Sequence, residues 1–208
     1  MCIRDSQQSS ASSLPLPSQL GTTSASIDGV NVPLLYSSSR QVNGVVPFAL
    51  QQNVTHLLLV AKGTALSVPQ PVTIASAQPA VFTVDGSGSG QGVVLGFLNG
   101  GAQVLADSTH PVSAGGYIVM YATGLGAVTP PVPDGVAGPS SPLSTVNGPI
   151  SLTIGGVNAT ITYAGLAPGF ASLYQVNAIV PAVAPGNSVP LVITVAGQDS
   201  PPVTIAVK

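Results

Sequence analysis

One eight-residue phrase occurs twice in the chain, as YQVNAIVP at 174–181 and as RQVNGVVP at 40–47. In both copies apolar or small residues alternate with polar ones, which is the period-two pattern of a half-buried β-strand. Gln175 and Asn177 are therefore expected on the face opposite to the apolar set. That set comprises Val176, Ala178 and Val180 in the later copy, and Val42, Gly44 and Val46 in the earlier one. The repetition predicts that one type of strand is used twice.

The phrase belongs to a series of three blocks that repeat in the same order. SASIDGVNVPLLY at 24–36 matches SLTIGGVNATITY at 151–163, and PVTIAS at 71–76 matches PVTIAV at 202–207. Three blocks in one order indicate an internal duplication. Asp28-Gly29 in the first block is a two-residue hairpin signal. Short strands separated by Gly and Pro turns predict an all-β fold built from β-sandwiches.

The composition argues against several functions. Only ten of the 208 residues are charged, four Lys or Arg and six Asp, and the net charge is -2. Nucleic-acid binding needs several cations on one face, so no nucleic-acid partner is predicted. No apolar run reaches the roughly 20 residues of a spanning helix, so no membrane span is predicted. Cys2 is the single cysteine, which excludes a disulfide framework or a thiolate metal site, and no cofactor is expected.

The first six residues, MCIRDS, differ in composition from everything after them. They resemble a translated sequencing-adapter read-through, so residues 1–6 are interpreted as an artefact and left out of the fold prediction. On this interpretation the true N-terminus is missing, and the visible sequence says nothing about a signal peptide.

Residues 14–208, nearly the whole chain, resemble a known family. GGYIVMYATGLGAVTPPVPDG at 115–135, YAGLAPG at 163–169, the phrase at 174–181 and the terminal SPPVTIAVK together resemble the Solibacter-type uncharacterised C-terminal domain family. YATGLG at 121–126 is also similar to the turn of IPT/TIG immunoglobulin-like domains. The resemblance implies immunoglobulin-like sandwiches and an extracellular or cell-surface location on exported bacterial proteins. It implies no catalytic residue, because the family has no assigned activity.

The duplication predicts two immunoglobulin-like domains in tandem. The first, 7–77, has no counterpart of YIVMYATGLG and is expected to be truncated at its N-terminus. The second, 78–208, is expected to be complete, with an added N-terminal hairpin segment at 78–115. The Gly/Ser run at 86–90 is interpreted as a turn or a mobile loop. A phosphate-binding loop would require a Lys and a following helix, and neither accompanies it.

Residues that could carry catalysis are scattered. The isolated acids sit in turn contexts and are Asp28, Asp85, Asp107, Asp134 and Asp199. His56 is expected on a strand and His110 in a loop, and no G-x-S-x-G elbow accompanies them. The chain is therefore predicted not to be an enzyme. The loop at 85–92 lacks the further acids of a calcium site, and whether it binds an ion stays open.

Five residues are candidate ligand contacts: Tyr36, Tyr163 and Tyr174 as aromatic platforms, and Gln175 and Asn177 as polar contacts. Because the Tyr and the Gln-x-Asn pair recur in both copies, a structural role is favoured, with the amides bonded to neighbouring loop backbone. The predicted function is a non-catalytic structural or spacer module at the C-terminus of an exported multidomain protein. The alternative is a carbohydrate- or cell-surface-binding module. Exposed aromatics along one sheet face would favour the alternative. The partner is unknown: a carbohydrate, a cell-surface polymer or neighbouring domains of the same chain.

Overall fold

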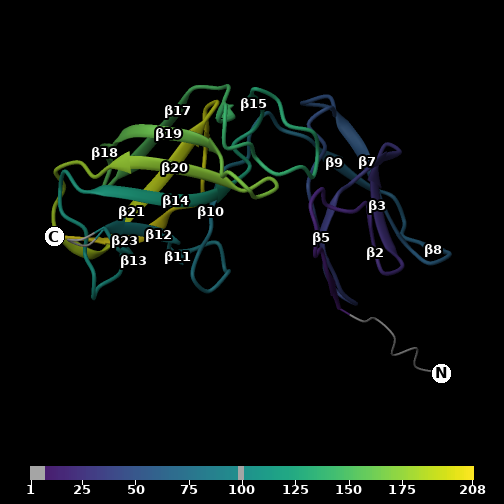
Figure 1. Cartoon of the computed structure of the whole chain (residues 1–208), viewed down its shortest axis with the longest axis horizontal. Coiled ribbons are helices and arrows are strands. Elements are labelled where there is room, and N and C mark those ends of the chain that lie inside the picture. Colours follow the sequence, from purple (N-terminus) through teal and green to yellow (C-terminus); the bar gives the residue numbers. More distant parts are fainter. Residues whose placement is uncertain (1–7, 98–100) are drawn as a thin grey trace. The chain divides into compact units, whose positions relative to one another are not determined.

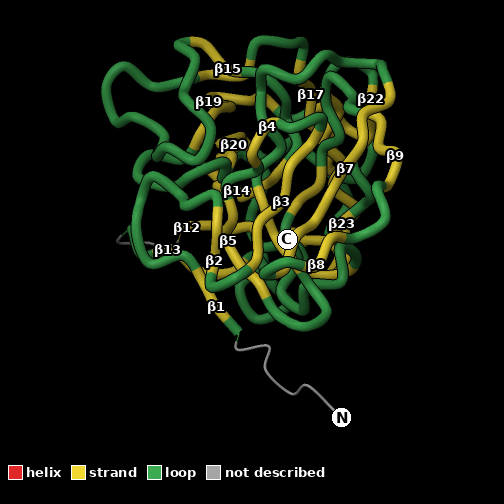
Figure 2. Tube along the Cα trace, turned by 90° about the vertical axis from the view of Figure 1, so that its right-hand side faces the viewer, coloured by secondary structure: helices red, strands yellow, loops and turns green. Residues whose placement is uncertain are grey.

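The structure is a computed structural model, and it describes residues 8–97 and 101–208. All regular secondary structure in these two ranges is β-strand, as the yellow segments in Figure 2 show. The described residues include no helix of the length and apolarity that a membrane crossing needs. The all-β prediction is confirmed for the described residues.

The chain forms two compact units. The first contains the described residues up to Ser76 together with two later segments, Val132–Gly138 and Pro168–Ser172. The second contains Ala77–Pro131, Pro139–Ala167 and Leu173–Lys208. The two later segments of the first unit are a difference from the continuous domains that the sequence suggested. Whether 7–77 and 78–208 fold independently stays a prediction.

Two sheets share the core of the first unit (Figure 1). One has the order β2-β3-β7-β8, with β4 on β3 and β9 on β7; the other has the order β1-β5-β6. The strands are β1 (Ser9–Ser10), β2 (Gln19–Leu20), β3 (Thr23–Ile27), β4 (Val30–Asn31), β5 (Leu34–Ser37), β6 (Val42–Gly44), β7 (Thr55–Lys62), β8 (Ala65–Leu66) and β9 (Gln70–Thr73). Apolar residues from both sheets, such as Ile27 and Leu34, form the core. The arrangement is consistent with a β-sandwich.

The second unit also has two sheets. The larger has the order β13-β12-β14-β20-β19-β16-β15, with β10 on β14. The smaller has the order β11-β23-β21-β17-β18, with β22 on β21. The strands are β10 (Ala80–Val81), β11 (Gly90–Gln91), β12 (Val94–Phe97), β13 (Gln103–Leu105), β14 (Tyr117–Thr123), β15 (Val128–Thr129), β16 (Thr145–Val146), β17 (Ile150–Ile154), β18 (Val157–Asn158), β19 (Thr160–Leu166), β20 (Tyr174–Ile179), β21 (Gly186–Val195), β22 (Gln198–Asp199) and β23 (Val203–Val207).

The strand pairings repeat between the units as the sequence blocks do. Ile27 lies opposite Leu58 across β3 and β7, and Ile154 lies opposite Leu191 across β17 and β21. Tyr36 lies opposite Asn43, as Tyr163 lies opposite Asn177. The register shifts just before the tyrosine in both copies. For the first two blocks, the duplication therefore extends from the sequence to the sheet register. The third block is shifted, because Val72 lies opposite His56 whereas its match Val203 lies opposite Leu191.

The added segment 78–115 is part of both sheets rather than a separate hairpin packed on them. β12 and β13 pair with each other, and β12 also pairs with β14 in the larger sheet. β11 pairs in parallel with β23 in the smaller sheet. The segment follows this path because its apolar runs continue the alternation of the sheets that they join.

The repeated phrase sits differently in the two units. β20 lies inside the larger sheet, between β14 and β19 (Figure 1), whereas β6 forms one end of the order β1-β5-β6 among the described residues. The burial differs accordingly: Val176 is fully buried, and Val42 is only half-buried. The predicted inward position of Val46 is wrong, because β6 ends at Gly44 and the next residue, Val45, turns inward instead. Val45 is 5% exposed and Val46 is 49% exposed.

Candidate functional site

Tyr174 belongs to the core and does not face a ligand. Its side chain is 4% exposed, and its hydroxyl donates a hydrogen bond to the carbonyl oxygen of Gly126. Burial raises the pKa of the Tyr174 hydroxyl to about 12. The YATGLG turn is thus tied to β20 by a buried tyrosine. A ligand on the outside of the sheet cannot stack on this ring.

Within each Gln-x-Asn pair, the Gln side chain bonds to the Asn side chain rather than to loop backbone. Gln175 Nε2 donates to Asn177 Oδ1 at 2.9 Å, and Gln41 Nε2 donates to Asn43 Oδ1 at 2.7 Å. Residues two apart on a strand share a face, so both side chains of each pair point the same way. The expected bonds to neighbouring loop backbone are not the ones that these two amide pairs make.

Three tyrosines and two amides of the second unit gather on the outer side of the larger sheet. Antiparallel partners share a face. Tyr117 lies opposite Ile179, Tyr121 opposite Gln175, and Tyr163 opposite Asn177. The alternate residues of β14 and β20, such as Met120 and Val176, are fully buried on the inner side. The predicted contacts Tyr163, Gln175 and Asn177 are therefore brought together, with Tyr117 and Tyr121 beside them.

Two phenylalanines extend this surface. Phe82 follows β10, which pairs with β14. Its backbone N–H donates to the carbonyl of Tyr121, so Phe82 lies beside Tyr121. The Phe97 and Tyr117 rings lie 5.7 Å apart at 56°. Phe82 is 45% exposed, Phe97 41% and Tyr117 39%. We define the outer face as Phe82, Phe97, Tyr117, Tyr121, Tyr163, Gln175, Asn177 and Ile179.

Tyr163 and Thr162 fix the geometry of the outer face. The Tyr163 hydroxyl donates to the carbonyl of Leu166 at 2.8 Å, and partial burial raises the pKa of that hydroxyl. Thr162 Oγ1 donates to the Tyr117 hydroxyl at 3.1 Å. These bonds hold two of the rings in place before any ligand arrives, which lowers the entropic cost of binding. In the first unit, Tyr36 is half-buried opposite Asn43 and has no comparable set of aromatic neighbours in that part of the structure.

A shallow cleft adjoins the outer face at Phe97 and Tyr117. Its volume is about 200 Å³, and it is also lined by His110, Ser113 and Lys208. Typical small-molecule pockets start at about 300 Å³. The cleft is too small to enclose a large ligand, but it adds polar groups to one end of the aromatic surface.

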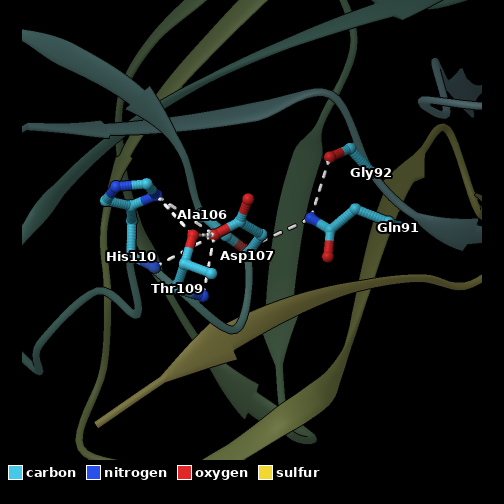
Figure 3. Close-up of polar contacts among 6 residues, drawn as sticks. All are labelled: Gln91, Gly92, Ala106, Asp107, Thr109 and His110. Carbon is cyan, nitrogen blue, oxygen red and sulfur yellow. Dashed lines mark hydrogen bonds and ion pairs between the residues drawn. The ribbon is translucent and has the colours of Figure 1, made fainter.

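His110 in this cleft belongs to a network with Asp107 and Thr109 (Figure 3). Asp107 Oδ1 accepts the Thr109 hydroxyl at 2.6 Å and the backbone N–H groups of Thr109 and His110. These bonds, led by the Thr109 hydroxyl, lower the pKa of Asp107. Both Thr109 Oγ1 and Asp107 Oδ1 approach the same ring nitrogen, His110 Nδ1, at 2.8 and 3.2 Å. A catalytic triad needs the nucleophile and the acid on opposite ring nitrogens, so the network has the geometry of a turn.

Gln91 fixes the strands behind that turn. Its Nε2 donates to the carbonyl of Gly92 at 3.1 Å and to the carbonyl of Ala106 at 3.2 Å (Figure 3). The amide thereby connects the end of β11 with the residue that follows β13. The Gln91 side chain thus bonds to the residue directly before the turn at 107–110.

Comparisons with known proteins add little to this geometry. No protein-family model and no curated protein matches the chain. Among solved structures, the chain is similar to surface layer protein SbsC, domains 4–9, at 16% identity and a TM-score of 0.24. The match covers 90% of this chain and 22% of that chain. A TM-score this low carries no argument about function, and the resemblance noted in the sequence stays a prediction.

The carboxylate of Asp85, in the loop after β10, accepts its hydrogen bond from within the same loop. Asp85 Oδ1 accepts the backbone N–H of Ser87 at 3.0 Å, and this bond is the main reason why the pKa of Asp85 is lowered. The Ser87 hydroxyl contacts Ser89, and three glycines of this loop have positive φ, which their lack of a side chain allows. Within the described residues, no three His, Cys, Asp or Glu side chains gather as metal ligands would.

The first unit contains a His–Asp pair, His56 and Asp28, that the equivalent positions of the second copy do not carry. His56 is 6% exposed, its Nδ1 lies 2.7 Å from Asp28 Oδ2, and its Nε2 lies 2.7 Å from the carbonyl oxygen of Gln51. Both ring nitrogens thus face acceptors, which suits the protonated ring. The Gln51 carbonyl and then Asp28 raise the pKa of His56. The backbone N–H of Leu57 and then His56 lower the pKa of Asp28.

The His56–Asp28 pair predicts that the free energy of unfolding of the first unit is highest between the folded pKa values of Asp28 and His56. The folded pKa of His56 is raised above 6.5, so its contribution is complete below that pH and is lost as the pH rises through the folded pKa. The folded pKa of Asp28 lies below 3.8, so its contribution is present above that pH and is lost as the pH falls through the folded pKa. Thermal melting of the full chain from pH 3 to 9 should show this dependence in the first unit's transition.

The second copy supplies the matched control. The structural equivalents of Asp28 and His56 are Gly155, at the same hairpin turn, and Val189 on β21. The double variant Asp28→Gly, His56→Val carries the residues of the second copy and should flatten the pH dependence. A pH dependence that persists in the double variant would belong to other groups.

Proposed function

We propose that the chain is a non-catalytic structural module, two immunoglobulin-like sandwiches in tandem within a longer exported bacterial protein. The observation that carries the proposal is the repeated register: Tyr36 opposite Asn43 and Tyr163 opposite Asn177, each after a register shift. A chain that duplicates a whole sandwich lengthens the protein by one folded body without adding chemistry. The same proposal places the chain outside the cell or at its surface, as the family resemblance implies.

A second function is favoured by the outer face of the second unit. Its exposed rings, Phe82, Phe97 and Tyr117, come from three strand segments that share one side of one sheet. Sugar rings present flat C–H surfaces that pack on aromatic rings, and amide groups such as those of Gln175 and Asn177 bond to sugar hydroxyls. No residue of the outer face is charged. We propose that this surface binds a neutral polysaccharide.

One binding experiment tests both functions. The full chain is run through native gels that contain soluble neutral polysaccharides, and it is sedimented with insoluble ones. Retention of the wild-type chain by a neutral polysaccharide is expected. Replacing an aromatic that stacks on the ligand typically costs more than 1 kcal/mol, so Tyr117→Ala and Phe97→Ala should each weaken binding about tenfold.

The control variant removes an exposed ring elsewhere. Phe170 is 58% exposed and belongs to the first unit, so Phe170→Ala should leave retention unchanged. If no neutral polysaccharide retains the wild-type chain, the structural role remains as the proposed function. If Phe170→Ala reduces retention as much as Tyr117→Ala, binding does not occur at the outer face.

A further inference from the structure

We propose that the edge of β6 that no described strand covers accepts an extended peptide strand from another polypeptide, with the alternating apolar pattern of β14. The second unit shows what occupies the equivalent edge of β20. β14 pairs along the whole of β20, from Tyr117 opposite Ile179 to Ala122 opposite Tyr174. The inward residues of β14 are Ile118, Met120 and Ala122, and each is fully buried. A strand in this position therefore closes the core as well as the sheet.

In the first unit, no strand of the described residues pairs with the equivalent edge. β6 pairs with β5 and forms an end of its sheet among the described residues. The core residues Leu58 and Val60 of β7 are half-buried, whereas their equivalents Leu191 and Ile193 are fully buried. Val42 and Val72 are also only half-buried. The apolar side chains of an added strand would cover these half-exposed groups, as β14 covers the core of the second unit.

The chemistry of the edge defines its occupant. Edge strands that resist pairing usually carry charge, proline or a bulge that turns the edge away. Residues 41–46, QVNGVV, contain no charge and no proline. An antiparallel strand gains main-chain hydrogen bonds along such an edge, and its alternate side chains give the specificity. The fitting partner is an uncharged segment with medium-sized apolar residues at every second position.

The test uses the full chain and a synthetic peptide of the sequence GGYIVMYATGLG, residues 115–126, with a soluble lysine tail and a fluorescent label. Saturable binding by anisotropy is expected. A control peptide carries Ser at the positions of Ile118, Met120 and Ala122 and should bind at least tenfold more weakly, because it has nothing to bury. This comparison leaves the protein unchanged. Equal binding of the two peptides would overturn the proposal.

Amide hydrogen exchange locates the bound peptide. Exchange at 40–44 should slow when the first peptide binds. Slowing confined to 174–180 would mean that the peptide displaces β14 from the second unit, and it would overturn the proposal.

A protein variant tests the inward side of the edge. Val42→Lys places a charge where the added strand would pack and should weaken peptide binding at least tenfold. Val30→Lys, at an exposed position on β4 in the other sheet of the same unit, should not weaken it. If Val42→Lys fails to fold, the comparison of the two peptides on the wild-type chain tests the proposal. Light scattering tests whether a second copy of the chain occupies the edge instead. A dimer that the peptide cannot dissociate would assign the edge to that second copy and overturn the proposal.

Discussion

Replacing Tyr174 with Ala is expected to lower the free energy of unfolding of the second unit by about 3 to 5 kcal/mol, the usual cost of removing a buried aromatic side chain. The ring is 4% exposed and lies on the inner side of β20. The substitution removes its packing and also the hydroxyl that bonds to Gly126 in the YATGLG turn. Denaturant unfolding of the full chain, followed by a probe in the second unit, measures the loss.

Two controls separate packing from surface effects. Tyr174→Phe keeps the ring and removes only the hydrogen bond, so a loss of about 1 kcal/mol is expected. Tyr121→Ala removes a half-buried ring on the outer face, and its cost should stay well below that of Tyr174→Ala. Because the folded pKa of Tyr174 is about 12 against an ordinary value of 10, stability should also fall between those pH values. A Tyr174→Ala variant as stable as Tyr121→Ala would contradict the core position of this residue.

The strand character of the repeated phrase could be predicted from the sequence because alternation depends on local spacing alone. Val176 and Ala178 are buried, and Gln175 and Asn177 are on the other side of β20, as the pattern indicated. The pattern failed at Val46, where a backbone bond from Val45 to Pro33 ends the alternation. That bond depends on the partner strand, which a single stretch of sequence does not specify.

The outer face was only partly predictable. Tyr163, Gln175 and Asn177 were singled out because they recur, but Phe82, Phe97, Tyr117 and Tyr121 have no counterpart in the first copy. Their common side follows from the pairing of β14 with β12 and β20, and this register is set by contacts distant in sequence. The alternation of Tyr117 and Tyr121 along one strand was the available signal. Tyr174 was named as a ligand platform because it is aromatic. Its position two residues before Val176 already indicated the buried face of β20.

The Asp28 and His56 pair could also have been found from the repeat. Aligned blocks place Gly155 where Asp28 stands, so a change at one hairpin position was visible. The matching change from Val189 to His56 needs the pairing of β3 with β7 and of β17 with β21, which the sequence alone did not supply. The two loops at 132–138 and 168–172 likewise joined the first unit through contacts that no local pattern announces.

One phrase serves as an interior strand in the second unit and, among the described residues, as an edge strand in the first. Native-state amide hydrogen exchange tests it most directly, because backbone groups paired on both sides exchange only through larger openings than edge groups. The measurement is made on the full chain, without peptide, at concentrations where light scattering shows a monomer. It compares 174–180 with 40–46, whose near-identical sequences have similar intrinsic exchange rates.

We predict protection at 174–180 that exceeds protection at 40–46 by a factor on the order of 10³, since interior strands open with a free energy near that of global unfolding. The variant Met120→Ser weakens the packing of β14 and should reduce the difference by lowering protection at 174–180. Equal protection of the two phrases in the wild-type chain would contradict the account, because β6 would then have a partner on both sides.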